Sequence, residues 1–156
     1  MALPANDTAS GSPRTTEAGA TDERTSGTDA AADPKVQLVI PATSRYLRLA
    51  RLTAAGLAGD LGFPMDAIED LRIAVDELCA AVIEDTTASA ELELTYSQHH
   101  GGLVVEGTCR ARSANAPDLH SVARELLNML ADEYSIGAID GHKNFRLVKY
   151  AESPQV

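Results

Sequence analysis

The strongest hydrophobic pattern along the chain is a helical stripe in residues 68–83, whose sequence is IEDLRIAVDELCAAVI. Apolar residues recur there at spacings of three and four, the period of one helix face; they are Ile68, Leu71, Val75, Leu78 and Val82. The pattern predicts a helix of about four turns whose stripe faces a core. A neighbouring flank carries Glu77, interpreted either as a solvated acid or as a general base that looks into a pocket.

A strand and a helix are predicted ahead of this stripe. Residues 36–40 show the alternation of a strand, which Pro41 stops. A helix then follows, with Gly62 just beyond its end and a stripe formed by Leu47, Ala50, Ala54, Leu57 and Leu61. Its start has a capping residue in Thr43 or Ser44. Asp66 and Glu69 have the spacing of a capping box for the next helix.

Beyond residue 85 the period changes from helix to strand. Residues 91–96 alternate, and residues 103–112 follow the glycine pair at 101 and 102, which predicts a hairpin. A third helix, introduced by Pro117, is predicted from the apolar residues Leu119, Val122, Leu126 and Met129. Residues 134–139 and 144–150 form a closing hairpin. This order predicts an α+β two-layer sandwich, a mainly antiparallel sheet with helices on one face.

Composition divides the chain into a domain, residues 35–150, and two tails. Residues 1–34 contain 2 Arg against 6 acids and no aromatic residue, which predicts a disordered acidic tail. Residues 151–156 form a short C-terminal tail. The formal net charge of −10 argues against direct nucleic-acid binding. No segment is long and apolar enough for a membrane span and no signal peptide is present, so we expect a cytoplasmic protein.

Candidate chemistry outside the Glu77 flank is sparse. Cys79 and Cys109 lie in an apolar helix and an apolar strand, which favours small buried hydrophobes over redox groups. His99 and His100 stand at a hairpin tip without further ligands, so no metal site is expected.

Three arginines follow one side of the first helix at steps of three: Arg45, Arg48 and Arg51. One interpretation is a solvated flank with salt bridges to neighbouring acids. The other is a docking edge for an acidic partner, since guanidinium groups pair with carboxylates in bidentate fashion. The sequence does not decide between the two.

Two stretches carry a family resemblance. Residues 40–83 read IPATSRYLRLARLTAAGLAGDLGFPMDAIEDLRIAVDELCAAVI, and later LLNMLADEYSI is followed by a glycine and NFRLVKY. Over residues 35–150 the chain resembles the anti-sigma factor serine kinases, bacterial switch proteins of the GHKL ATPase superfamily with the Bergerat fold. The resemblance implies the same α+β layout. It also implies a homodimer, for which the small residues Ala50, Ala54 and Gly56 of the first helix offer a surface.

The resemblance weakens at the nucleotide site. Glu77 matches the family glutamate that activates the attacking group, but Ala81 stands where an asparagine holds magnesium, and a methyl group cannot ligate a hard cation. Residues 106–120 lack the Asp-x-Gly that reads adenine. His120, Ser121 and Ala123 occupy the places of lid glycines. We therefore expect a vestigial Glu77 and no bound ATP, magnesium or other metal.

Three functional hypotheses follow. The first is an anti-sigma factor, a pseudokinase of stress-response type, that sequesters an alternative sigma factor and is released by an anti-anti-sigma (STAS-type) partner. The second is an ATP- and Mg-dependent serine protein kinase that phosphorylates this antagonist. The third is a redox-gated regulator that uses Cys79 and Cys109.

Overall fold

Segments in which apolar and polar residues alternate form the strands of a five-stranded sheet in the computed structural model, which describes residues 33–152. The strands are β1 (Lys35–Pro41), β2 (Glu91–His99), β3 (Gly102–Arg110), β4 (Glu133–Ile139) and β5 (His142–Tyr150). Their order is β1-β2-β3-β5-β4, and all neighbours are antiparallel. The predicted tails, 1–34 and 151–156, lie almost entirely outside the described residues.

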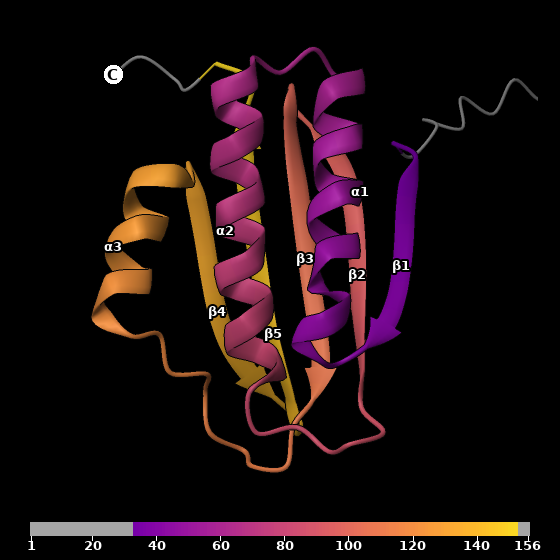
Figure 1. Ribbon diagram of the computed structural model, residues 1–156, viewed down its shortest axis with the longest axis vertical. Coiled ribbons are helices and arrows are strands. Elements are labelled where there is room, and N and C mark those ends of the chain that lie inside the picture. The colour runs from indigo at the N-terminus through magenta and orange to yellow at the C-terminus, as the bar shows by residue number, and fades with distance from the viewer. Residues whose placement is uncertain (1–32, 153–156) are drawn as a thin grey trace, which may run out of the picture. The chain divides into compact units, whose positions relative to one another are not determined.

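Three helices cover one face of this sheet, as Figure 1 shows, which confirms the predicted α+β architecture. They are α1 (Leu47–Asp60), preceded by the short 3-10 helix η1 (Ser44–Tyr46), α2 (Met65–Ile83) and α3 (Ser121–Leu130). α2 lies between the other two and contacts both (Figure 1). Among residues 33–152, no helix has the length and apolar character needed to cross a membrane.

The core lies between α2 and the helix-facing side of the sheet. Leu71, Val75, Leu78 and Val82 of the predicted stripe are fully buried. They share one cluster with the inward side chains of the strands, such as Leu94 and Leu147. Each large apolar side chain buried in this way contributes about 1.5–3 kcal/mol relative to exposure. The organising role predicted for this helix is therefore confirmed.

The predicted helix caps are wrong. Thr43 precedes η1 without a side-chain cap hydrogen bond, and α2 begins directly after Pro64, likewise without one. Asp66 lies inside the first turn, where its carboxylate accepts the N–H of its neighbour Ala67 at 3.0 Å. Glu69 pairs instead with Arg72 at 2.6 Å. No capping box forms, because the helix starts one residue before Asp66.

The face predicted for the third helix is also partly wrong. Ala123 and Leu127 are the buried residues of α3, whereas Val122 and Met129 are exposed. In the first helix, Ala50 and Ala54 are buried within the protomer. These two alanines therefore cannot form the dimer surface that was predicted for them, and the dimer stays a prediction.

Candidate functional site

The flank of α2 that carries Glu77 and Ala81 is the predicted catalytic position. The two residues lie one helical turn apart and therefore project in the same general direction. The Ala81 methyl is only 7% exposed and belongs to the hydrophobic core cluster, while Glu77 is partly exposed. This flank presents the Glu77 carboxylate, but Ala81, four residues later, offers no oxygen that could bind a metal ion.

The segment between β3 and α3 corresponds to the predicted lid position. Residues 111–120 form this connection, and Leu119 within it is buried in the same core cluster as Ala81. His120 and Ser121 are exposed, whereas Ala123 is buried in that cluster. The connection and the first turn of α3 thus contribute Leu119 and Ala123 to the core.

A buried lysine, which the sequence analysis did not single out, joins α2 to α3. Lys149 on β5 is only 6% exposed and donates to the Asp70 carboxylate at 3.2 Å and to the Leu130 carbonyl at 2.9 Å. Asp70 belongs to α2, and Leu130 is the last residue of α3. The signal was available in the sequence, since Lys149 is in phase with the apolar positions Phe145 and Leu147 of its strand.

The three arginines predicted as a docking edge have different surroundings. Arg51 of α1 forms a salt bridge with Asp76 of α2, so this guanidinium serves the contact between the two helices. The Arg45 guanidinium lies 5.6 Å from the centre of the Tyr46 ring, a cation–π distance. Arg45 and Arg48 are exposed. Of the three arginines, Arg45 and Arg48 are thus exposed, whereas Arg51 is partly buried and paired with an acid of the protein itself.

Both cysteines are free thiols in the core. Burial raises the pKa of the Cys79 thiol well above its ordinary value, and the charge of Asp76 raises it further. Burial also raises the pKa of Cys109, although the Lys143 ammonium opposes the rise. A thiol that is buried and protonated is a poor nucleophile. The described surroundings therefore lack the exposure that a redox sensor needs.

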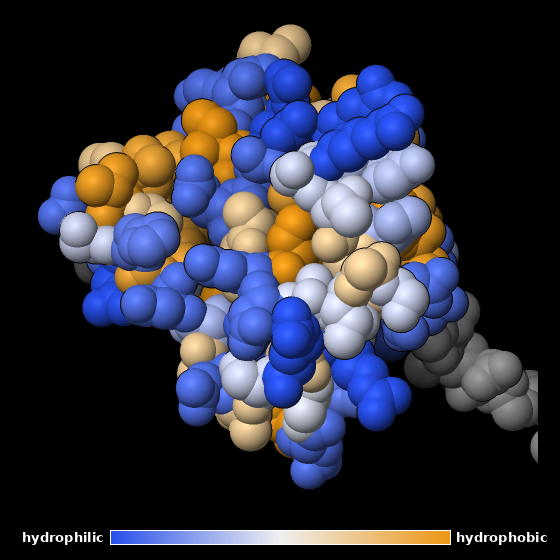
Figure 2. All heavy atoms as spheres, turned by 60° about the horizontal axis from the view of Figure 1, so that its bottom comes forward, coloured by the Kyte–Doolittle hydropathy of each residue, from blue (hydrophilic) through white to orange (hydrophobic). Residues whose placement is uncertain are grey.

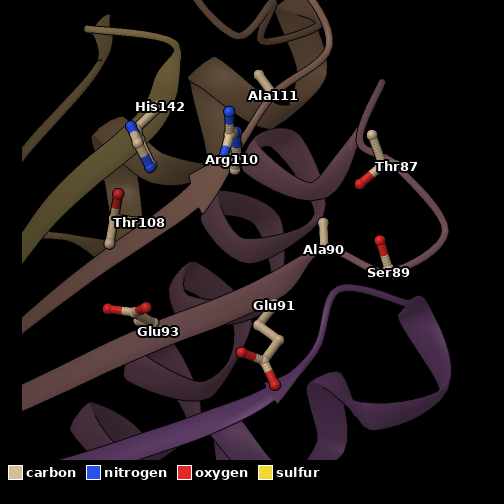
Figure 3. A pocket seen from close by; sticks show the side chains of 9 residues that line it. All are labelled: Thr87, Ser89, Ala90, Glu91, Glu93, Thr108, Arg110, Ala111 and His142. Atoms are coloured by element: carbon tan, nitrogen blue, oxygen red, sulfur yellow. The ribbon is translucent and has the colours of Figure 1, made fainter.

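A polar hollow of about 620 Å³ lies on the sheet face that the helices leave bare. Arg110 and His142 project side by side along one wall, and Glu91 and Glu93 of β2 lie away from them (Figure 3). The cross-strand pairing places these residues on the side of the sheet opposite α2. The hollow is thus separate from the Glu77 flank, and its lining includes none of the three arginines Arg45, Arg48 and Arg51. Across residues 33–152, no cluster of three His, Cys, Asp or Glu could hold a metal ion.

Comparison with known proteins gives one family of relatives. The chain is similar to the serine-protein kinases RsbW of Bacillus thuringiensis (strain Al Hakam) and Bacillus cereus (strain B4264), with 42% identity over 50 residues in each case. These 50 residues are 32% of this chain and 31% of each relative, so the match spans about a third of their length. No family profile matches the chain.

The fold has a counterpart among solved structures. The crystal structure of the RsbU and RsbW domains of Rv1364c from Mycobacterium tuberculosis superimposes with a TM-score of 0.57 and covers 75% of this chain and 32% of that one. Sequence identity in this superposition is 15%, so the likeness concerns the fold.

Proposed function

We propose that this chain is a partner-switching protein of the anti-sigma factor serine kinase family, which holds an alternative sigma factor and yields it to an anti-anti-sigma antagonist. In this proposal the switch operates through protein contacts, without ATP binding or phosphate transfer. The sequence match that supports the proposal covers 32% of the chain, and the fold shared with the solved structure covers 75% of it.

The observation that carries the proposal is the burial of Ala81. Magnesium takes oxygen ligands and neutralises a bound triphosphate, and the matching family position supplies such a ligand. Here that position offers a buried methyl group. Leu119 and Ala123, from the segment where the resemblance places phosphate-binding glycines, belong to the same apolar cluster. A triphosphate beside these groups would lose hydration without regaining a cation, which is unfavourable.

A serine protein kinase remains the second candidate, and one observation favours it. Glu77 keeps the position of the family base and is partly exposed, so it could still accept a proton. The RsbW relatives are themselves described as serine-protein kinases. This candidate requires another group to take the role of the missing magnesium ligand.

Calorimetric titration of the full-length protein with Mg-ATP separates the two candidates. We expect no saturable binding, and no transfer of labelled phosphate to an anti-anti-sigma protein. Ala81→Asn alone should not restore either, because residues 106–120 would still lack the Asp-x-Gly that reads adenine, and His120, Ser121 and Ala123 would still replace the lid glycines. Phosphate transfer that is lost in Glu77→Ala, but kept in the control Glu69→Ala, would establish the kinase instead.

We also propose a homodimer, on the resemblance alone. Ala50 and Ala54 are excluded from its surface, since both are buried within the protomer. Light scattering of the full chain at micromolar concentration provides the test. A mass equal to that of the monomer would contradict the proposal.

A further inference from the structure

One flank of α3 carries an apolar stripe that no described part of the chain covers. Val122 is 66% exposed and Met129 is 70% exposed, with the partly exposed Leu126 between them. The spacings of four and three place the three side chains in one row on the helix. Figure 2 shows apolar side chains gathered at the surface over α3, at the left edge of the molecule.

The fold itself does not require apolar residues at these positions. Ala123 and Leu127 anchor α3 in the core, and both are buried. Val122 and Met129 lie on the neighbouring flank, so polar residues there would leave the core unchanged. Spacings of three and four are those of a seam between two helices. The stripe therefore fits a helix that binds from outside.

The exposed border of the stripe is acidic. On the helix, Glu125 lies next to Val122 and Met129 on the solvent side and is exposed. Asp118 ahead of the helix is an exposed acid as well, whereas Glu133 behind the helix pairs with Arg146. Arg124 is exposed but projects from the far side of the helix, where its guanidinium approaches the Leu119 carbonyl at 3.4 Å. An acidic border favours a partner with basic flanks.

Two occupants from this chain fit the stripe poorly. The N-terminal residues 1–34 are acidic and contain no apolar row at helical spacing, so the border would repel them. A second copy would bring Glu125 close to its own counterpart in a two-fold pair. With only three side chains from each copy, the buried area would also fall far short of the roughly 1,200 Å² that a stable dimer interface buries.

We propose that the stripe formed by Val122, Leu126 and Met129 docks an amphipathic helix of a partner protein, with apolar residues at matching spacing and Lys or Arg beside them. The inference rests on the proposed function only in assigning the chain to protein binding. α1 and α3 lie on opposite sides of α2 (Figure 1), so this surface is separate from Arg45 and Arg48. The domain then presents one basic and one acidic-rimmed docking surface, which select partner segments of opposite charge.

Fluorescence anisotropy with the full-length protein tests this with two synthetic helical peptides. Both carry leucines at the seam spacing, and the flanking positions are lysine in one and glutamate in the other. We expect the lysine peptide to bind, and the double substitution Val122→Ser with Met129→Ser to weaken it roughly tenfold or more. The matched control, Leu52→Ser with Ile139→Ser, alters two apolar residues of similar exposure elsewhere on the surface, and this variant should bind like the wild type. Glu125→Lys should shift preference toward the glutamate peptide.

Hydrogen exchange locates the contact independently of the variants. Amides of residues 121–130 in the wild type should gain protection when the lysine peptide is added. Equal binding of the two peptides, or binding that the serine variant retains in full, would overturn the proposal. A wild-type dimer that this variant converts to a monomer would overturn it too, and would assign the stripe to self-association. None of these experiments uses Mg-ATP. The titration that tests the proposed function can therefore fail while the docking proposal holds, or the reverse.

Discussion

Two buried lysines on β5 show how single residues tie the helical layer to the sheet. Lys149 donates to the last residue of α3, and Lys143 donates to the Glu84 carbonyl at the end of α2, at 2.8 Å. The last carbonyls of a helix have no partner within it and carry partial negative charge. A lysine ammonium satisfies both needs. One strand thus stabilises the C-terminal ends of two helices.

Lys149→Met should lower the free energy of unfolding by about 2 kcal/mol, because the Asp70 carboxylate and the Leu130 carbonyl would lose a charged donor. Urea denaturation measures the change. Lys35→Met serves as the control, since Lys35 is an exposed lysine on another strand and should change little. Asp70→Asn combined with Lys149→Met should cost less than the sum of the two. Strict additivity would show that the ion pair contributes nothing.

The buried thiol of Cys79 makes stability depend on pH at the alkaline end. Its pKa is raised in the folded state from an ordinary value of 9.0, chiefly by burial. Above that pH the unfolded chain releases a proton that the folded chain retains, so the free energy of unfolding falls as pH rises. Each such group contributes at most about 1.4 kcal/mol per pH unit.

Burial also raises the pKa of Tyr96, whose hydroxyl donates to the Ala50 carbonyl at 3.0 Å. Denaturation at pH values from neutral to alkaline should therefore show falling stability. The fall should be shallower in Cys79→Ala, which retains only Tyr96 and Cys109 among the groups whose pKa burial raises. An identical slope in the variant would contradict the assignment to Cys79.

At the scale of elements, periodicity located the strands and α2 because long stripes such as Leu71 to Val82 have one period and one buried face. The caps were missed because tertiary contacts fix the helix entrances. Phe63 is buried beside the turn, and the Pro64 carbonyl accepts the Ile68 N–H at 3.1 Å, which starts α2 before Asp66. Local capping patterns carry no information on such anchors.

The orientation of α3 shows a different limit of sequence patterns. Residues 119–130 contain two overlapping apolar rows, one through Val122 and Met129 and one through Ala123 and Leu127. The larger side chains favoured the first row, but α3 lies at the edge of the helical layer and buries the second. Which row faces the sheet depends on the path of residues 111–120, which periodicity does not describe.

The register between β3 and β5 is equally hidden in the sequence, and it makes a specific demand. Gly107 faces Phe145 across the strands, and a Cβ on Gly107 would overlap the phenyl ring. Gly107→Ala should therefore lower the melting temperature by several degrees, corresponding to about 1–3 kcal/mol. Gly137→Ala on β4 is the control, since a Cβ there would meet only Asn144 Oδ1, at an ordinary contact distance of 3.9 Å. Adding Phe145→Leu to Gly107→Ala should recover part of the loss, and no recovery would contradict the proposed overlap.

Across the whole molecule, charge is distributed unevenly over the helical layer. The chain has a formal net charge of −10, yet α1 and the turn before it expose Arg45 and Arg48. The sequence analysis placed these arginines along one side of a single helix, whereas the structure has Arg45 in η1 and Arg48 in α1. It could not show that Arg51 is engaged, because its partner Asp76 lies 25 residues away on another helix. The helical pattern singled out Glu77 without deciding its role, and the matching positions of Glu77 and Ala81 in a nucleotide site came from the family resemblance.

The pairing of Arg51 changes how the arginine edge should be tested. Reversing Arg51 would place two carboxylates together between α1 and α2, and would mix stability with binding. Arg45→Glu with Arg48→Glu avoids this, since both residues are exposed. We expect this variant to weaken sigma factor binding roughly tenfold at low salt, and less at high salt because screening reduces the repulsion.

A control of equal charge separates a docking edge from general electrostatics. Arg110→Glu with Arg112→Glu makes the same change in net charge at two exposed residues, one at the end of β3 and one just after it, outside α1 and η1. Titration calorimetry with the sigma factor should show near wild-type affinity for this control, and Glu77→Ala should also bind like the wild type. If both arginine pairs weakened binding equally, the attraction would come from overall charge, and Arg45 and Arg48 would form no specific edge. A loss confined to their reversal would instead fix the first docking surface on α1, with α2 between it and the stripe on α3.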